Sequence, residues 1–205
     1  MRKHNEKEEY KPYIKTSKFN STGTTAVVVD WKTGRGIHCL SQGEVLWFYI
    51  LRWDDDNIDI KEQVPLDMNI CNEIFDKTGI PKVRNRKFVM STDFLVTKND
   101  GSRIAYSVKN DRDIDERTLQ LLCVEKMYWM SQGIDFKILF KEDVNIILAN
   151  NIRVLVEFYS PESVMDEISN AKHLLAIKKK KIDLTTRMID IEYLYEQGLI
   201  QRKRV

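Results

Sequence analysis

The chain has 205 residues, of which 42% are apolar and 31% charged, with a net charge of +2; this is a globular composition and not a disordered or fibrous one. Its longest apolar run, Val45 to Leu51, is far too short to cross a bilayer, and no charged-then-apolar leader opens the chain. Three cysteines without a CxxC pair argue against a disulfide framework or a zinc site, so we expect a cytoplasmic protein with no membrane partner.

The chain begins with a polar, basic arm over residues 1–23, which lacks periodicity. A short strand is expected over residues 24–30, and Gly34 and Gly36 break the pattern after it. The elements expected next are a helix from Ser41 to Trp53, a turn over residues 54–57, a strand over 58–66 and a helix that ends at Gly79.

A β-hairpin is the next expected unit. Its strands are Lys87 to Thr97 and Arg103 to Lys109, and Asn99-Asp100-Gly101 makes the tight turn between them. A helix over residues 115–132 and a strand over 136–140 follow. The order α-β-α-β-β-α-β predicts an α/β fold, with a mixed sheet flanked by helices.

The pattern changes in the last part of the chain. Residues 144–159 are apolar and fit a helix or a strand, whereas residues 161–178 and 183–197 have a helical pattern. Gly198 precedes a short basic segment over residues 199–205, which we interpret as a terminal strand. Two domains are therefore predicted: residues 1–142, and a small helical, winged-helix-like domain over residues 143–205.

The hairpin carries the first candidate site residues. Ser107 and Lys109 are two positions apart in a strand and therefore face the same side, and the adjacent strand can bring Asp93 beside them. A carboxylate and a lysine on one face of a hairpin form the core of a PD-(D/E)xK nuclease site, in which the carboxylate binds Mg²⁺ through its oxygens. An Asp and a Lys on neighbouring strands more often form a surface ion pair, but the apolar residues around these two predict a buried hairpin.

Glu44 is the third candidate. It follows Ser41 by three residues, and the Ser-x-x-Glu pattern is that of a capping box, which is a commoner role for a glutamate than metal binding. The two roles are compatible, because a carboxylate in the first turn of a helix can also face a metal on the sheet.

Five blocks of sequence, in order across residues 24–140, carry a family resemblance. They are TGRGIHCLSQGE (33–44), DIKEQVPL (59–66), VMSTDFLV (89–96), AYSVK (105–109) and VEKMYWMSQGIDFKIL (124–139). Together they resemble the TnsA-type transposon endonucleases, the strand-cutting subunits of heteromeric cut-and-paste transposases in the PD-(D/E)xK superfamily. Lys61 stands where that family has an arginine.

The resemblance implies a restriction-endonuclease-like catalytic domain over residues 1–142. Its catalytic positions map to Glu44, Asp93 and Lys109, and its metal ligands to Glu44, Asp93, Ser107 and the Val108 carbonyl. The implied cofactor is Mg²⁺, for which Mn²⁺ can substitute. Ser107 is a departure, because the family often has an acidic residue or glutamine there; a hydroxyl is a weaker ligand, which leaves the number of metal ions open.

Three further residues are expected near the site. Glu62 and Gln63 either support the metal ligands or contact DNA, and the alternative for both is an exposed strand face. Glu125, on the helix after the hairpin, is expected to have a structural or supporting role.

The activity implied by the resemblance is hydrolysis of the 5′ (non-transferred) strand at each transposon end, in the bacterial cytoplasm at the nucleoid. The implied partners are double-stranded DNA, the DDE transposase subunit TnsB and the AAA+ ATPase subunit TnsC. The basic clusters Lys178–Lys181 and Arg202–Arg204 are either solvated charge or contacts to phosphate or to a partner. Two alternatives remain: a stand-alone nuclease of the same fold, and a catalytically silent DNA-binding or assembly subunit, which Ser107 motivates.

Overall fold

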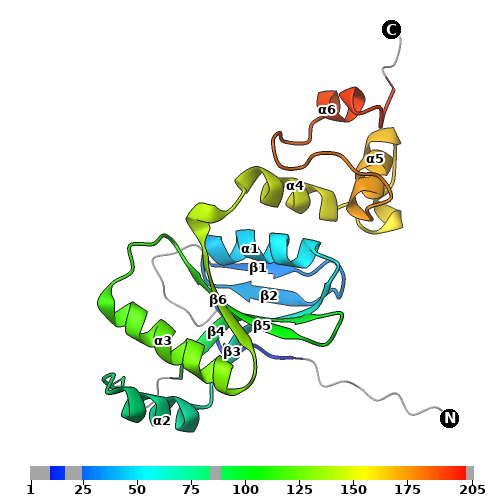
Figure 1. The fold of residues 1–205 in the computed structure, drawn as a ribbon. Helices are drawn as coiled ribbons and strands as arrows, with labels where there is room; N and C mark the ends of the chain where they lie inside the picture. The colour runs from blue at the N-terminus through cyan, green and yellow to red at the C-terminus, as the bar shows by residue number, and fades with distance from the viewer. Residues whose placement is uncertain (1–9, 17–24, 84–88, 202–205) are drawn as a thin grey trace, which may run out of the picture.

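A four-stranded mixed sheet forms the centre of the computed structural model, which describes residues 10–16, 25–83 and 89–201 (Figure 1). The strands lie in the order β3 (Asn57–Pro65), β4 (Ser91–Lys98), β5 (Arg103–Lys109) and β6 (Asp135–Phe140). The first three are antiparallel neighbours, and β6 joins β5 in parallel. The predicted α/β class, the mixed sheet and the element order from the first helix to the last strand are confirmed.

Helices cover both faces of this sheet. On one face lie α1 (Gln42–Trp53) and the small hairpin of β1 (Ala26–Val29) and β2 (Gly36–Cys39). On the other face lie α2 (Met68–Thr78) and α3 (Glu116–Ser131).

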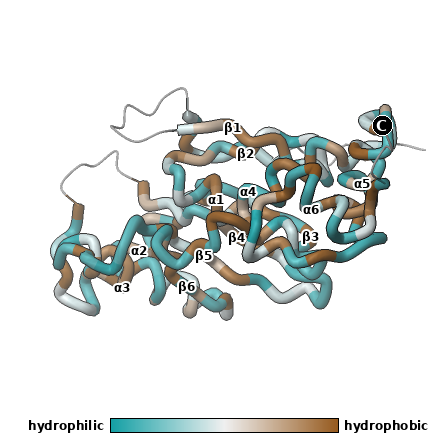
Figure 2. Tube along the Cα trace, turned by 90° about the horizontal axis from the view of Figure 1, so that it is seen from above, coloured by the Kyte–Doolittle hydropathy of each residue, from teal (hydrophilic) through white to brown (hydrophobic). Residues whose placement is uncertain are grey.

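Successive side chains of β4 point to opposite faces of the sheet and so contribute to the hydrophobic core on each face. Phe94 and Val96 point to the α1 side, whereas Leu95 points to the α2–α3 side. Figure 2 shows hydrophobic residues along β4 and β5 in the interior of the molecule. The predicted buried hairpin is therefore confirmed in the described residues, whereas Lys87 and Phe88 of its first predicted strand lie outside them.

The β1–β2 hairpin differs from the prediction, because β2 was not foreseen. Gly34 makes the turn in a left-handed conformation with φ of 76°, and Gly36 lies inside β2 opposite Val29. A Cβ added at Gly36 would lie 3.0 Å from Val27 Cγ1, so the glycine there provides room for close packing and does not end the strand.

The C-terminal part is helical. It contains α4 (Ile146–Val156), α5 (Glu167–Ala176) and α6 (Ile191–Glu196), with the 3₁₀ turns η2 (Lys141–Asp143) and η3 (Pro161–Ser163). Residues 144–159, left open by the sequence, thus form mainly helix α4. The helix predicted over residues 183–197 is restricted to α6, because Asp183 accepts hydrogen bonds from Thr185 and Thr186 and forms a turn of its own.

Of the predicted winged-helix-like domain, only the helices are found. In the described residues from 143 to 201 there is no strand, and the predicted terminal strand is absent over residues 199–201, while residues 202–205 lie outside the described part. Of the predicted basic arm, residues 1–9 and 17–23 also lie outside it. No helix in the described ranges is long and apolar enough to span a bilayer.

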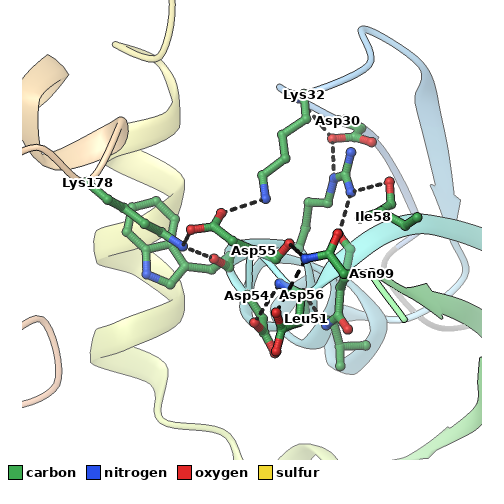
Figure 3. Close-up of polar contacts among 12 residues, drawn as sticks. Asp30, Lys32, Leu51, Asp54, Asp55, Asp56, Ile58, Asn99 and Lys178 are labelled. Carbon is green, nitrogen blue, oxygen red and sulfur yellow. Dashed lines mark hydrogen bonds and ion pairs between the residues drawn. The ribbon is translucent and has the colours of Figure 1, made fainter. Parts of the chain in front are cut away.

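The acidic turn between α1 and β3 joins the C-terminal helices to the sheet domain (Figure 3). Asp55 accepts hydrogen bonds from Lys32 at 3.0 Å and from Lys178 at 2.7 Å. Lys178, which follows α5 with a left-handed φ of 58°, also donates to the Trp53 carbonyl, and its ammonium lies 4.8 Å from the centre of the Trp53 ring. Together these contacts attach the end of α5 to the last residue of α1.

Candidate active site

Asp93 lies near the start of β4, where three groups donate hydrogen bonds to its carboxylate. The Val108 backbone N–H donates to Oδ2 at 2.6 Å, and the Ser107 hydroxyl reaches the same oxygen at 3.5 Å. The amide nitrogen of Gln63 lies 3.4 Å from Oδ1. The hairpin thus brings Asp93 and Ser107 together, as expected from their positions on adjacent strands.

Glu44 approaches from the first turn of α1 and is only 5% exposed. Ser41 caps the helix: its hydroxyl accepts from the Glu44 N–H at 3.1 Å and lies 2.9 Å from Glu44 Oε1, to which it donates. Glu44 Oε2 accepts from the Leu40 N–H at 2.8 Å and from the Gln63 amide at 3.1 Å. Glu44 is therefore part of a helix cap and also faces Asp93 across Gln63, so both interpretations of Glu44 fit the geometry.

Lys109 ends β5 on the same side as Ser107. Its ammonium donates to the Ser107 hydroxyl at 3.0 Å and to the Val108 carbonyl at 3.1 Å. Among the described residues no carboxylate forms an ion pair with Lys109, so the simple Asp93–Lys109 surface pair is not found. Two neutral oxygens hold the lysine, and its positive charge is not cancelled by a direct partner.

Burial disfavours the charged forms of the two carboxyl groups of this site. Burial raises the pKa of Glu44 to about 8, and repulsion by Asp93 adds to the effect. Burial also raises the pKa of Asp93, although Lys109 and the hydrogen bond from Val108 oppose the shift. Carboxyl groups in this state bind either protons or a cation.

The oxygen atoms present fit a magnesium ion. Mg²⁺ is typically held by one or two carboxylates together with neutral oxygens, and the site offers Glu44, Asp93, the Ser107 hydroxyl and the Val108 carbonyl. The raised pKa values of the two carboxyls support the fit, because a divalent cation would offset their charge. Within the described ranges no cluster of three or more His, Cys, Asp or Glu side chains is arranged around a metal position.

The two auxiliary candidates have different surroundings, and neither lies on an exposed face. Glu62 is fully buried, and its carboxylate is occupied by Arg35, at 2.7 and 2.9 Å, and by the His38 N–H at 3.2 Å. Gln63 is 1% exposed and bridges Glu44 and Asp93. Glu62 therefore joins β3 to the β1–β2 hairpin, whereas Gln63 is part of the site.

Another buried acid, Glu125, lies on the α3 side of the β4–β5 hairpin. Glu125 on α3 is buried and accepts a hydrogen bond from Thr92 at 2.6 Å, and Thr92 in turn accepts from the Trp129 indole at 2.6 Å. Burial raises the pKa of Glu125 to about 8, against the effect of the Thr92 hydrogen bond; Asp93 raises it further and Ser107 lowers it. Neither Arg35 nor Thr92 could be recognised from the sequence as the partner of a buried acid, because neither contact follows from local spacing.

Two comparisons with known proteins show the family of the chain. The family described as "TnsA-like endonuclease N terminal" matches residues 54–141, which include Asp93, Ser107, Val108 and Lys109 but not Glu44. The chain is also 33% identical over 199 residues to the transposon Tn7 transposition protein TnsA of Escherichia coli, a match that covers 93% of this chain and 73% of that protein. The chain therefore belongs to the TnsA-like endonuclease family.

Proposed function

We propose that this protein is a Mg²⁺-dependent DNA endonuclease that cuts the 5′, non-transferred strand at each end of a transposon. The observation that supports the chemistry is the convergence of Glu44 from α1, Asp93 from β4 and Lys109 from β5 on one small region. Family membership supports the substrate class, because the Tn7 relative is a transposition protein.

Each proposed catalytic residue has a distinct task. Glu44 and Asp93, with the Ser107 hydroxyl and the Val108 carbonyl, would hold the metal ion. When bound, Mg²⁺ polarises the scissile phosphate and lowers the pKa of a bound water. Lys109, held only by neutral oxygens, offsets the negative charge that builds on the phosphate as the water attacks.

We assign substrate and partner binding mainly to the two segments that flank the sheet domain in the chain, which are the basic N-terminal arm and the helical C-terminal domain. Residues 1–142, with the basic arm, are the proposed catalytic domain, and residues 143–205 are proposed as a small helical domain that binds DNA or partners. The proposed partners are double-stranded transposon-end DNA, the DDE transposase TnsB and the AAA+ ATPase TnsC. The protein is expected to act with them in the bacterial cytoplasm, at the nucleoid.

The test is strand-specific cleavage of a transposon-end DNA by the full chain, with the partner transposase and Mg²⁺. Asp93→Ala and Lys109→Ala are expected to lose 5′-strand cleavage by at least about a hundredfold. Asp135→Ala and Lys137→Ala are charge-matched controls, because both residues are exposed on β6. Equal cleavage by wild type and both site variants would overturn the assignment of the site.

Ser107 supports one competing function, a catalytically silent assembly subunit, since the hydroxyl replaces the usual acidic ligand. The same experiment separates the two. If Asp93→Ala abolishes cleavage while the complex with DNA and transposase still assembles in a gel-shift assay, the silent-subunit hypothesis is refuted. Cleavage of plain duplex without any partner would instead favour a stand-alone nuclease.

A further inference from the structure

Gln63 has a backbone conformation that its residue type rarely adopts. It lies inside strand β3, yet its φ is +49°, in the left-handed region that side chains other than glycine generally avoid. Among the described residues that are not glycine, Lys178 alone shares a positive φ. Such a conformation persists only where surrounding contacts enforce it, and it occurs preferentially at functional sites.

The left-handed residue changes the faces of β3. Ile60 packs in the core beneath α1, and Glu62 on the same side binds Arg35 beside β2. Val64 and Leu66 instead pack against the core of α2 and α3. In a regular strand residues 62 and 64 would face the same side, so the chain crosses from one face to the other at Gln63.

The same crossing occurs in the neighbouring strand at Asp93. Thr92 contacts Glu125 and Trp129 of α3, whereas Phe94 belongs to the core beneath α1. Glu62 pairs with Phe94 and Val64 with Thr92, so Gln63 and Asp93 stand opposite each other between these pairs. Both side chains therefore lie where the two faces meet, and Glu44 reaches the same place from α1.

The Gln63 amide is matched to two carboxylates. Its nitrogen has two hydrogens and donates to Glu44 Oε2 at 3.1 Å and to Asp93 Oδ1 at 3.4 Å. Its oxygen accepts from the Ser91 hydroxyl at 3.4 Å, which fixes which end of the amide faces the acids. Because the amide is neutral, it draws the two carboxylates together and leaves their negative charge for a cation, which a lysine or arginine in its place would cancel.

We propose that Gln63 is the positioning residue of the metal site: its amide orients Glu44 and Asp93 as a pair of ligands and so sets the affinity for the divalent cation. The inference rests on the proposed function, because it concerns the same metal site. Groups that hydrogen-bond to metal ligands typically change metal affinity 10- to 100-fold when removed.

The experiment measures Mn²⁺ binding to the full chain without DNA, by the electron paramagnetic resonance signal of free Mn²⁺. Gln63→Leu keeps the size of the side chain and removes the donor, and it is expected to weaken Mn²⁺ binding about 10- to 100-fold. Gln63→Asn keeps an amide, but one methylene shorter, and asparagine tolerates the left-handed conformation. It should also bind Mn²⁺ more weakly, and it provides the test if Gln63→Leu does not fold, as judged by circular dichroism.

Two further variants separate the possible outcomes. Asn57→Ala removes a buried amide at the other end of β3, whose side chain donates to the Leu51 carbonyl. It should lower the melting temperature in EDTA without changing the Mn²⁺ affinity, which distinguishes positioning from general support of the strand. Asp93→Ala should abolish stoichiometric Mn²⁺ binding.

If folded Gln63 variants bind Mn²⁺ as tightly as wild type, while Asp93→Ala does not bind it, the role of Gln63 is refuted and the metal site stands. An equal loss of affinity in Asn57→Ala would also refute a specific role. If wild type and Asp93→Ala show the same lack of stoichiometric Mn²⁺, the metal site itself is refuted.

Discussion

The buried acids predict how stability depends on pH in the metal-free protein. The pKa of both Glu44 and Glu125 is raised from an ordinary value of 4.5 to about 8, in each case chiefly by burial. Between these two pH values the folded chain holds protons that the unfolded chain has released. The free energy of unfolding must therefore fall as pH rises through this window, and the fall ends near pH 8.

The magnitude follows from the number of protons. Each carboxyl contributes at most about 1.4 kcal/mol per pH unit within the window. Glu44→Gln is expected to remove the share of Glu44 while it keeps the oxygen that accepts from the Leu40 N–H. Glu125→Gln should remove a similar contribution. In each single variant the free energy of unfolding should therefore depend less steeply on pH than in wild type.

The assay is urea unfolding in EDTA at several pH values between about 5.5 and 7.5, a range inside the window set by these pKa values. Titratable groups that do not interact with Glu44 or Glu125 are common to all three proteins and cancel in the differences between slopes. Adding Mg²⁺ should flatten the wild-type slope more than that of Glu44→Gln, because the cation replaces the proton only at the site. A slope that is the same in wild type and Glu44→Gln would refute the raised pKa of Glu44.

Two other substitutions test the charges around the site. Ser107→Glu places a third carboxylate beside Asp93, whose Oδ2 lies 3.5 Å from the Ser107 hydroxyl. The variant should bind Mn²⁺ more tightly in calorimetry. It should also be less stable in EDTA, since two charges about 4 Å apart near a protein surface repel by up to about 4 kcal/mol. Weaker Mn²⁺ binding would show that Ser107 does not face the metal. Arg35→Ala leaves the fully buried Glu62 unpaired and should cost about 3–5 kcal/mol in urea unfolding; a loss below about 1 kcal/mol would contradict that ion pair.

Sequence patterns predicted the sheet domain well because most of its elements are long and bounded by clear signals. Alternation of apolar residues identified the hairpin of β4 and β5, and Gly79 ended α2 in the left-handed conformation expected of a helix cap. Residues 144–159 could not be assigned because α4 is apolar on more than one side, contacting both α1 and α5. Strand β2 was missed because a glycine such as Gly36 usually indicates the end of a strand.

The proximity of Glu44, Asp93 and Lys109 was predicted from the sequence, but the hydrogen bonds that connect them were not. Strand periodicity placed Ser107 and Lys109 on one face with Asp93 beside them, and the family resemblance singled out Glu44, Asp93 and Lys109 as catalytic positions. The bridge through Gln63 depends on a left-handed residue in a strand, and periodicity assumes that no such residue occurs. Contacts of this kind require the three-dimensional arrangement of β3, β4 and α1.

Helix α1 has a mechanical consequence that follows from what is attached to its two ends. Its first turn carries Glu44, and its last residue, Trp53, is attached to Lys178 at the end of α5. Twelve residues form a stiff rod about 18 Å long. Any movement of α5 that keeps Lys178 bonded to Trp53 must also move the C-terminal end of α1. The N-terminal end of α1 then shifts Glu44 relative to the sheet that carries Asp93. A protein that binds the C-terminal helices would thus change the position of Glu44 relative to Asp93 without touching DNA or metal.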